Sequence, residues 1–363
     1  MKTILVIKKE ERKYLSEAIA LLDTLGIKDP EIHYVKKPNH RYYLQEDLVK
    51  VLSDNMSEKP SLIVIYDRLK PWQYYNLARG LKDTEIWDIV TLLLKIFEQN
   101  AGTLESKLKI ELLRIRHQIP FIKEYVRFSK LGEQAGFMGA GAYGYEALLN
   151  SLRRKASKIS RKLDEIKYKR ELQTISRTKL GIPTVAIVGY TSVGKTTLYN
   201  KLTGDNKLTG SALFKTLAPK SGLVNTMCGK IIVIDTIGFI RKMPEEIVDL
   251  FHAVISELKY SDQIVLLADL TDPVEDFIEK LLTSVDILKK VGVVDKPLLV
   301  LLNKRDLVSE DIAKEYEKLA LNILADEKVY SVRDILSGSV LLGDVIEELL
   351  RSICKNIDLS RRI

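Results

Sequence analysis

Three short motifs in the second half of the chain carry the residues best suited to chemistry. The first, GYTSVGKTT, fits the pattern G-x-x-x-x-G-K-[ST] and follows the β-branched run 184–188. A helical pattern comes directly after it, so the motif has the strand–loop–helix context that a phosphate-binding loop needs. In such a loop the backbone N–H groups face phosphate oxygens, and the dipole of the following helix favours their negative charge. We therefore expect the whole loop to contact a phosphorylated ligand through Gly189, Tyr190, Thr191, Ser192, Val193, Gly194, Lys195, Thr196 and Thr197.

The second motif, DTIG, follows the apolar run 230–234. Asp235, at the carboxyl end of a predicted strand, can hold Mg²⁺ through water, and the N–H of Gly238 can meet a γ-phosphate. In the first motif, Lys195 is expected to reach the β- and γ-phosphates, and the hydroxyl of Thr196 is expected to bind the same Mg²⁺. A DTxG string alone is weak evidence, but after a phosphate-binding loop it indicates a nucleoside triphosphate site.

The third motif, NKRD, follows the apolar run 298–302. Its carboxylate, Asp306, can accept two hydrogen bonds from the ring N–H and the exocyclic amine of guanine. Adenine offers no such pair of donors and would leave the carboxylate unpaired. Asn303 is expected to brace the neighbouring loops, and the stem of Lys304 is expected to pack on the base. Three motifs in this order, each at the end of a predicted strand, predict a domain that binds GTP or GDP with Mg²⁺.

Weaker patterns suggest further contacts with the nucleotide. In LFKTLAPKSGLV, Thr216 is the best candidate for a switch threonine that meets Mg²⁺ and the γ-phosphate, and Ser221 is the alternative. Ser331 and Val332, after the β-like run 328–330, are candidates for the last loop that contacts guanine. The predicted catalytic residues are therefore Lys195, Thr216 and Gly238, and the predicted metal ligands are Thr196, Thr216 and Asp235.

The residue directly after the second motif is Phe239, where many small GTPases carry a glutamine that positions the attacking water. A phenylalanine side chain cannot hydrogen-bond water. We therefore expect slow intrinsic hydrolysis that a partner accelerates by ordering the site.

Two sets of elements must position these motifs. The first hundred residues alternate strand-like and helix-like runs, which predicts a small parallel α/β unit. Strands are expected at Thr3–Ile7, Glu31–Val35 and Leu62–Tyr66, and helices at Ser16–Leu25, Gln45–Met56, Pro71–Leu81 and roughly Trp87–His117. After the glycine-rich stretch Gly132–Gly144, apolar residues recur at spacings of three and four from Leu152 to Ile166. With a similar rhythm upstream, this predicts an antiparallel helical pair.

The expected fold is therefore α/β. An N-terminal α/β unit with an antiparallel helical pair occupies residues 1–178, divided near residue 100, and a doubly wound P-loop GTPase domain occupies residues 179–363. Glycine and proline near residue 182 mark the boundary between the two.

Positive charge is concentrated in one segment. Residues 151–180 hold eleven basic and three acidic residues, which equals the net charge of +8 for the whole chain. A basic stripe on one helix is expected where a protein meets a polyanion such as RNA, although a solvated helix face is the plain alternative. The residues expected to touch such a partner are Arg153, Arg154, Lys155, Lys158, Arg161 and Lys162.

Composition excludes several other classes of protein. With 46% hydrophobic and 29% charged residues, wholesale disorder is not expected, and no apolar run is long enough to span a membrane. Cys228 and Cys354 lie far apart in sequence, and nothing in their spacing demands a disulfide. We expect a cytoplasmic, reduced protein, and a monomer.

Taken together, these motifs and the segments around them resemble the HflX family of ribosome-associated GTPases. The matching stretches are GYTSVGKTT, LFKTLAP and, most specifically, DTIGFIRKMPEEIVDLFHAVISEL from Asp235 to Leu258. Outside the GTPase domain, LKPWQYYNLARGL matches the family at Pro71, Gln73, Asn76 and Leu77, and Ile96–Pro120 resembles another family segment.

The resemblance implies that the chain binds the large ribosomal subunit and ribosomal RNA in its GTP state. In bacterial members it further implies separation of stalled ribosomes. Two alternatives share the same residues. One is a signalling GTPase with a protein effector, and the other is a ribosome-assembly GTPase with an RNA effector. In either, the nucleotide could act mainly as a binding switch.

Overall fold

The computed structural model describes residues 2–54, 59–130, 142–179, 181–205, 220–236, 238–241, 243–245, 247–248, 258–290, 292–293, 295–326 and 331–360. Its chain divides into two compact units, residues 1–169 and 170–363. This division falls within one long helix, whereas the boundary predicted from the sequence lies near the end of that helix, and we keep the boundary near residue 178 as a prediction. Across the described residues, no helix is long and apolar enough to cross a membrane.

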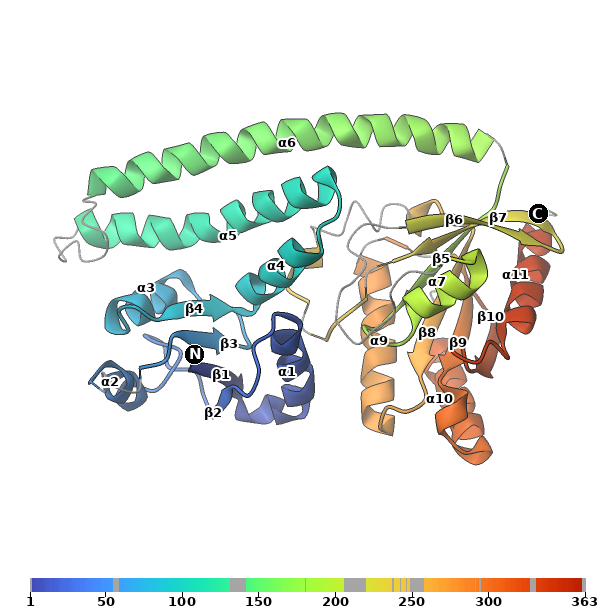
Figure 1. The fold of residues 1–363 in the computed structure, drawn as a ribbon, viewed down its shortest axis with the longest axis horizontal. Coiled ribbons are helices and arrows are strands. Elements are labelled where there is room, and N and C mark those ends of the chain that lie inside the picture. The colour runs from blue at the N-terminus through green and yellow to red at the C-terminus, as the bar shows by residue number, and fades with distance from the viewer. Residues whose placement is uncertain are drawn as a thin grey trace. The chain divides into compact units, whose positions relative to one another are not determined.

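Unit 1 begins with a parallel four-stranded sheet in the order β2-β1-β3-β4 (Figure 1). Apart from Lys8, every residue of the two central strands is buried, as expected for a parallel sheet covered on both faces. The strands are β1 (Thr3–Lys8), β2 (Glu31–Val35), β3 (Leu62–Ile65) and β4 (Glu85–Asp88). The helices among and after them are η1 (Lys9–Tyr14), α1 (Leu15–Thr24), α2 (Glu46–Asp54), α3 (Pro71–Gly80) and α4 (Ile89–Asn100).

One predicted element is wrong. Instead of a continuous helix over Trp87–His117, the chain forms strand β4, helix α4, a short break and helix α5 (Leu104–Lys130). Asp88 ends β4 and caps α4, since its carboxylate accepts hydrogen bonds from the N–H and hydroxyl of Thr91. After the break, the hydroxyl of Thr103 accepts from the N–H of Ser106 at the start of α5. Side-chain caps at Asp88 and Thr103 therefore divide a region that apolar periodicity alone predicts to be one helix.

The family-like segment on α3 holds a neighbouring loop by its amide side chains. Gln73 Nε2 donates to the carbonyl of Asn39 at 2.9 Å, and Asn76 Nδ2 donates to the carbonyl of Arg41 at 3.1 Å. Asn39 and Tyr43 pair their backbones across this loop. The polar residues of this segment thus support the local fold.

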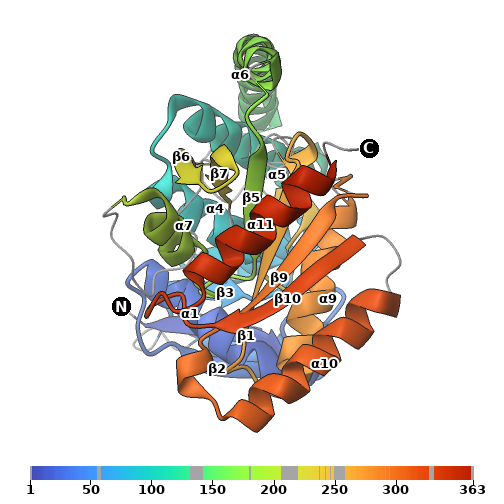
Figure 2. The ribbon, with the colours of Figure 1, turned by 90° about the vertical axis from the view of Figure 1, so that its right-hand side faces the viewer.

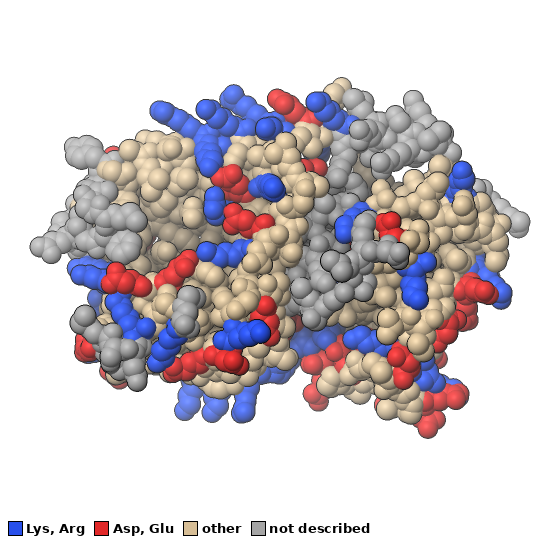
Figure 3. Space-filling model, viewed as in Figure 1, with Lys and Arg blue, Asp and Glu red and all other residues tan. Residues whose placement is uncertain are grey.

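Helices α5 and α6 (Ala142–Lys179) form the predicted antiparallel pair (Figure 1). Leu112 and Ile115 of α5 are buried against Ile159 of α6. The described basic residues of α6 lie outside this seam and are exposed, as the blue side chains along α6 show (Figure 3). The apolar seam is therefore core, and the basic face is left to solvent.

Unit 2 contains a six-stranded sheet in the order β10-β9-β8-β5-β7-β6, parallel except for β6 (Figure 2). Its strands are β5 (Thr184–Gly189), β6 (Lys220–Thr226), β7 (Gly229–Asp235), β8 (Gln263–Asp269), β9 (Pro297–Asn303) and β10 (Ser331–Gly338). Its described helices are α7 (Lys195–Thr203), α9 (Val274–Lys290), η2 (Arg305–Leu307), α10 (Glu310–Asp326) and α11 (Ile346–Ser360). From β5 the chain first adds strands on one side and then returns to add β8 on the other. Ligands of open α/β sheets bind at the carboxyl ends of the strands beside such a reversal.

Both faces of this sheet are covered by helices. The core on one face joins the sheet to α7 and α11 through residues such as Leu198 and Ile353. Helices α9 and α10 pack on each other, where the rings of Phe277 and Tyr316 meet edge to face at 4.7 Å. The predicted α/β fold with a doubly wound second domain is confirmed.

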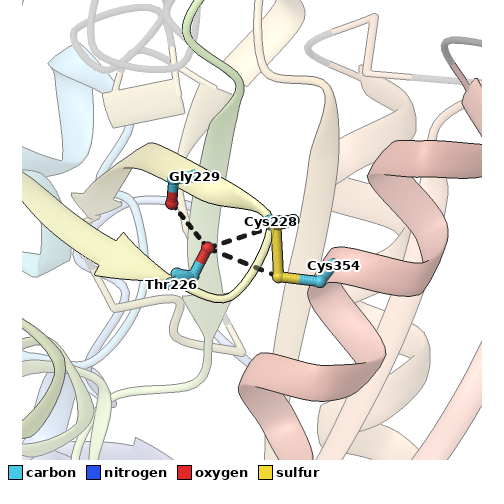
Figure 4. The surroundings of a disulfide bond; sticks show 4 residues. All are labelled: Thr226, Cys228, Gly229 and Cys354. Carbon is cyan, nitrogen blue, oxygen red and sulfur yellow. Dashed lines mark hydrogen bonds between the residues drawn. A yellow bond between two sulfur atoms is a disulfide. The ribbon is translucent and has the colours of Figure 1, made fainter.

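The cysteines are paired, contrary to the expectation of a reduced chain. Cys228, in the turn between β6 and β7, forms a disulfide with Cys354 of α11 across 126 residues of sequence (Figure 4). The hydroxyl of Thr226 lies beside both sulfur atoms and donates to the carbonyl of Gly229. Sequence distance concealed this pair because only the packing of the hairpin on α11 brings the two residues together.

Candidate nucleotide-binding site

The phosphate-binding loop lies between β5 and α7, at the carboxyl edge of the sheet. Gly194 is the N-cap of α7 with φ of +106°, and Gly189 has φ of +145°, conformations that favour glycine. A Cβ at Gly189 would lie 2.5 Å from the carbonyl oxygen of Leu267, and one at Gly194 would lie 2.4 Å from Asn303 Nδ2. Both glycines are therefore required by close packing as well as by the backbone turn.

The ammonium group of Lys195 is enclosed within this loop. The residue is only 6% exposed, and its Nζ donates to the carbonyl of Tyr190 at 2.5 Å. Burial lowers the pKa of Lys195 to about 8, and the charge of Asp235 only partly opposes this shift. A cation buried in this way is stabilised when an anion such as a phosphate arrives.

Two oxygen-bearing side chains meet beside Lys195. The hydroxyl of Thr196, in the first turn of α7, donates to Asp235 Oδ2 at 3.0 Å, and Asp235 at the end of β7 is fully buried. A hydroxyl and a carboxylate are the oxygen ligands that Mg²⁺ prefers. The residues present therefore fit a magnesium ion.

Asn303 links three loops at this edge. Its Nδ2 donates to the carbonyl of Val193 at 2.7 Å, and its Oδ1 accepts from the N–H of Val340 at 2.9 Å. The phosphate-binding loop is thereby tied to the segment after β10. Asp306, in η2, is exposed and available to a base.

Sequence patterns missed one partner of Lys304. Its ammonium pairs with Asp269, which ends β8 and sits opposite Asn303 in the parallel ladder. Asp269 also accepts from the N–H of Thr271 at 3.0 Å. The sequence signal for Asp269 was a carboxylate at the end of an apolar strand. The same signal identified Asp235.

The prediction for the last guanine loop is wrong. Ser331 and Val332 begin β10 and pair with Pro297 and Leu298, so they lie at the amino edge of the sheet, opposite the nucleotide site. The carboxyl end of β10 is Gly338, which pairs with Asn303. The loop at the correct edge is therefore Ser337–Ser339. A Ser-Gly-Ser string after Ile335 and Leu336 was the signal for it.

The segment after Asp235 is docked on the phosphate-binding loop through its backbone. The N–H of Thr191 donates to the carbonyl of Phe239 at 2.9 Å, and the N–H of Phe239 donates to the carbonyl of Gly189 at 3.1 Å. A Cβ at Gly238 would lie 2.8 Å from the Cα of Thr191 and 3.0 Å from Lys195 Nζ. Gly238 is thus held against the lysine that is expected to meet the γ-phosphate.

The remaining switch predictions are only partly covered by the structure. Thr216 lies outside the described residues. Its alternative, Ser221, is an exposed residue of β6 whose backbone pairs with Ile234 in the antiparallel ladder. Among the described residues, no group of three or more His, Cys, Asp or Glu side chains could hold a metal ion.

Three known protein families match successive parts of the chain between residues 12 and 304. Residues 184–304 match a family described as "50S ribosome-binding GTPase". Residues 100–177 match "GTP-binding GTPase Middle Region", and residues 12–98 match "GTP-binding GTPase N-terminal".

Individual relatives agree with these matches. The chain is 39% identical to the GTPase HflX of Saccharolobus solfataricus over 93% of this chain and 94% of that one. It is 34% identical to the GTPase HflX of Thermococcus kodakarensis, over 97% and 80% of the two chains. Among solved structures, a GTP-binding protein of Sulfolobus solfataricus in complex with GDP is 33% identical, with a TM-score of 0.54 and 99% of each chain covered. A structure of SsGBP with GDP, also 33% identical, aligns over 99% of each chain with a TM-score of 0.58.

Proposed function

The chain belongs to the HflX family of GTPases, and we propose that its GTP-bound state binds the large ribosomal subunit through the basic face of α6. One observation carries this proposal. The described basic residues of α6 are exposed on the side of the helix away from α5, while the apolar side of the same helix packs against α5. The description of the matching family as ribosome-binding supports the choice of partner.

In the nucleotide site, each side chain has a distinct proposed role. The amides of the phosphate-binding loop and Lys195 stabilise the charge that develops on the β- and γ-phosphates as water attacks in line. Asp306 accepts from guanine, and Ser337–Ser339 closes the guanine pocket from the neighbouring strand. Thr196 and Asp235 would hold Mg²⁺, which would supply positive charge to neutralise the phosphates.

Phe239 is the proposed reason why the free protein hydrolyses GTP slowly. Its side chain is 3% exposed and cannot hydrogen-bond water, so it cannot position the nucleophile. Hydrolysis by the free protein is therefore slow. Binding of the ribosomal subunit orders the missing contact and accelerates hydrolysis.

On the RNA side, the contact is electrostatic. We expect six exposed basic residues of α6 to contact phosphates of the ribosomal RNA. The affinity for the subunit should therefore fall steeply as salt rises. Lys155 differs from the other five, because its ammonium pairs with Glu111 of α5 at 2.5 Å and an RNA phosphate would compete with that carboxylate. The six are Arg153, Arg154, Lys155, Lys158, Arg161 and Lys162.

The test is GTP hydrolysis by the purified protein, with and without purified large ribosomal subunits. We expect strong stimulation that weakens as salt rises, and co-sedimentation with the subunits in the presence of a non-hydrolysable GTP analogue but not GDP. A triple variant, Arg153→Glu, Arg154→Glu and Lys158→Glu, should lose both effects. A matched control with Lys50→Glu and Lys82→Glu, exposed residues elsewhere in unit 1, should keep them.

An unchanged slow rate without co-sedimentation would exclude the ribosomal partner and favour a protein effector. Separation of ribosomal subunits is the downstream step that we propose for the bound state. It is measured by sedimentation of whole ribosomes incubated with the protein and GTP analogue.

A further inference from the structure

A charged side chain close to Gly238 is buried against a helix. The side chain of Arg241 is only 5% exposed, and its Nη2 lies 2.8 Å from Asp276 Oδ1. Its Nη1 lies 3.8 Å from Glu279 Oε2. Both carboxylates come from α9 and stand three residues apart, so they share one face of the helix. Burial works against the charge of Arg241, but the hydrogen bond to Asp276 raises its pKa, and the guanidinium remains a cation.

The same helix also supports the phosphate-binding loop. Lys280 of α9 lies over the ring of Tyr190, with its Nζ 5.2 Å from the ring centroid, and pairs with Asp272. These residues and Thr191 line a hollow with about 20 Å³ of water-accessible space between the loop and α9. Helix α9 is therefore a common support for the phosphate-binding loop and for the segment that follows β7.

The residues that directly follow Gly238 are attached both to the loop and to α9. Phe239 is fixed by its two backbone hydrogen bonds to the loop, Ile240 is fully buried, and Arg241 is clamped on α9. A buried guanidinium that lost its carboxylates would leave an uncompensated charge, so the clamp favours one docked position of the segment strongly. That position sets where the N–H of Gly238 points.

We propose that Arg241 is a positioning residue for GTP hydrolysis. Its clamp on Asp276 and Glu279 holds the Gly238 N–H toward the γ-phosphate. This inference rests on the proposed contact between Gly238 and the γ-phosphate. It predicts that Arg241 affects the response to the third phosphate and has little effect on binding of the diphosphate.

The experiment compares Arg241→Gln with the wild type in three measurements: the dissociation constant for GDP, the dissociation constant for a non-hydrolysable GTP analogue, and kcat and KM for GTP. We expect GDP affinity within about twofold of wild type, analogue affinity about tenfold weaker and kcat about tenfold lower. Asp276→Asn, which leaves Arg241 in place, should shift the same values in the same direction by a smaller factor. Arg241→Lys, which keeps the charge but loses the planar fork, should fall between wild type and Arg241→Gln.

Glu275→Gln is the matched control, because Glu275 lies exposed in the first turn of α9 beside Asp276. It removes a similar charge from the same helix and should leave all three measurements unchanged. Equal losses of GDP and analogue affinity in Arg241→Gln and Asp276→Asn would overturn the inference, since they would indicate a merely structural role. Unchanged values in both variants would overturn it as well.

Gly238→Ala separates this inference from the function on which it rests. If Gly238→Ala weakens the analogue and not GDP while Arg241→Gln has no effect, only the role of Arg241 fails. If Gly238→Ala also leaves the ratio of the two affinities unchanged, the contact between Gly238 and the γ-phosphate fails, and the role of Arg241 fails with it.

Discussion

The two units each place a lysine at the carboxyl edge of a parallel sheet, and the two lysines behave in opposite ways. In unit 1, Lys8 ends β1, and its ammonium lies 2.6 Å from Asp67 Oδ2, which also accepts from the hydroxyl of Tyr43 at 2.9 Å. Partial burial disfavours the charge of Lys8, but the hydrogen bond and charge of Asp67 raise its pKa. In unit 2, Lys195 donates to a neutral carbonyl, and burial lowers its pKa to about 8.

In unit 1 the charged groups at the sheet edge are paired with one another, whereas in unit 2 the lysine at the sheet edge has no carboxylate of the described residues hydrogen-bonded to it and suits an anionic ligand. Asp88, at the end of β4, is also satisfied from within unit 1, since His117 lies 3.1 Å from its carboxylate and Thr91 donates to it twice. Similar topology thus gives two different outcomes. The loops and side chains at the strand ends, and not the sheet, decide whether an anion binds.

The strongest test of this contrast removes each lysine in turn. Lys195→Ala should weaken GTP binding about a thousandfold, because it removes charge-assisted bonds to two phosphates worth about 2 kcal/mol each. Lys8→Ala should leave GTP affinity within about twofold. Fluorescent nucleotide titration measures both. A comparable loss in the two variants would contradict the distinction between the edges.

The disulfide is the next largest difference, because both cysteines of the chain lie in unit 2. Reduction, or Cys354→Ser, should lower the free energy of unfolding of unit 2 by about 4 kcal/mol, since the closed loop spans 126 residues. Thermal unfolding with and without reductant measures the change, and hydrogen exchange localises it. Cys354→Ser should become insensitive to reductant. An equal loss of protection in unit 1 would contradict the assignment.

A smaller effect is expected in unit 1 from His117→Leu. Burial disfavours the carboxylate of Asp88, yet the hydrogen bond and charge of His117 hold its pKa below the usual value. Without His117, the buried carboxylate of Asp88 keeps its two hydrogen bonds from Thr91 but loses the one it shares with the imidazole, and unit 1 should lose about 2 kcal/mol of stability. Faster hydrogen exchange in β4 and α5, with unit 2 unchanged, is the expected result. His33→Ala, at a more exposed histidine paired with Glu31, should have no such effect.

The smallest expected effect is the uptake of a proton by Lys195 when the nucleotide binds. The pKa of Lys195 falls from 10.5 to about 8 in the protein, and phosphate binds its cationic form. Below this pH the lysine is already charged, so nucleotide affinity is constant; above it, binding must take up a proton, and affinity falls by up to about tenfold per pH unit. Calorimetry in two buffers of different ionisation enthalpy should detect uptake of about half a proton at pH 8 and almost none at pH 6.5. Uptake that persists at pH 6.5 would contradict the lowered pKa.

Local patterns predicted much of the fold and most of the positions in the candidate site. A glycine pattern predicted the position of the phosphate-binding loop, and apolar runs predicted the strand ends that carry Asp235 and Asn303. The helical pair was predictable because its seam repeats at a fixed spacing. By contrast, β4 and the break before α5 depend on side-chain caps at Asp88 and Thr103. The spacing of apolar residues gives no indication of such caps.

Some features became visible only once the sheet was formed. Ser331 and Ser337 lie at the two ends of the same short segment, and only the parallel register with β9 places Ser337 at the nucleotide edge. The same holds for Cys228 with Cys354 and for Arg241 with Asp276, since these pairs are distant in sequence and adjacent in space.

Short-range patterns therefore predict the candidate chemistry of this protein: a phosphate-binding loop, a carboxylate proposed to select guanine, and a basic helix, each defined by residue types close together in the chain. The tertiary structure decided which strand ends share an edge, which lysine is neutralised and which is left for a phosphate, and which helix supports the segment after β7. The physical reason is that backbone turns and helix faces depend on near neighbours, whereas burial and charge pairing depend on residues that the chain brings together from far apart.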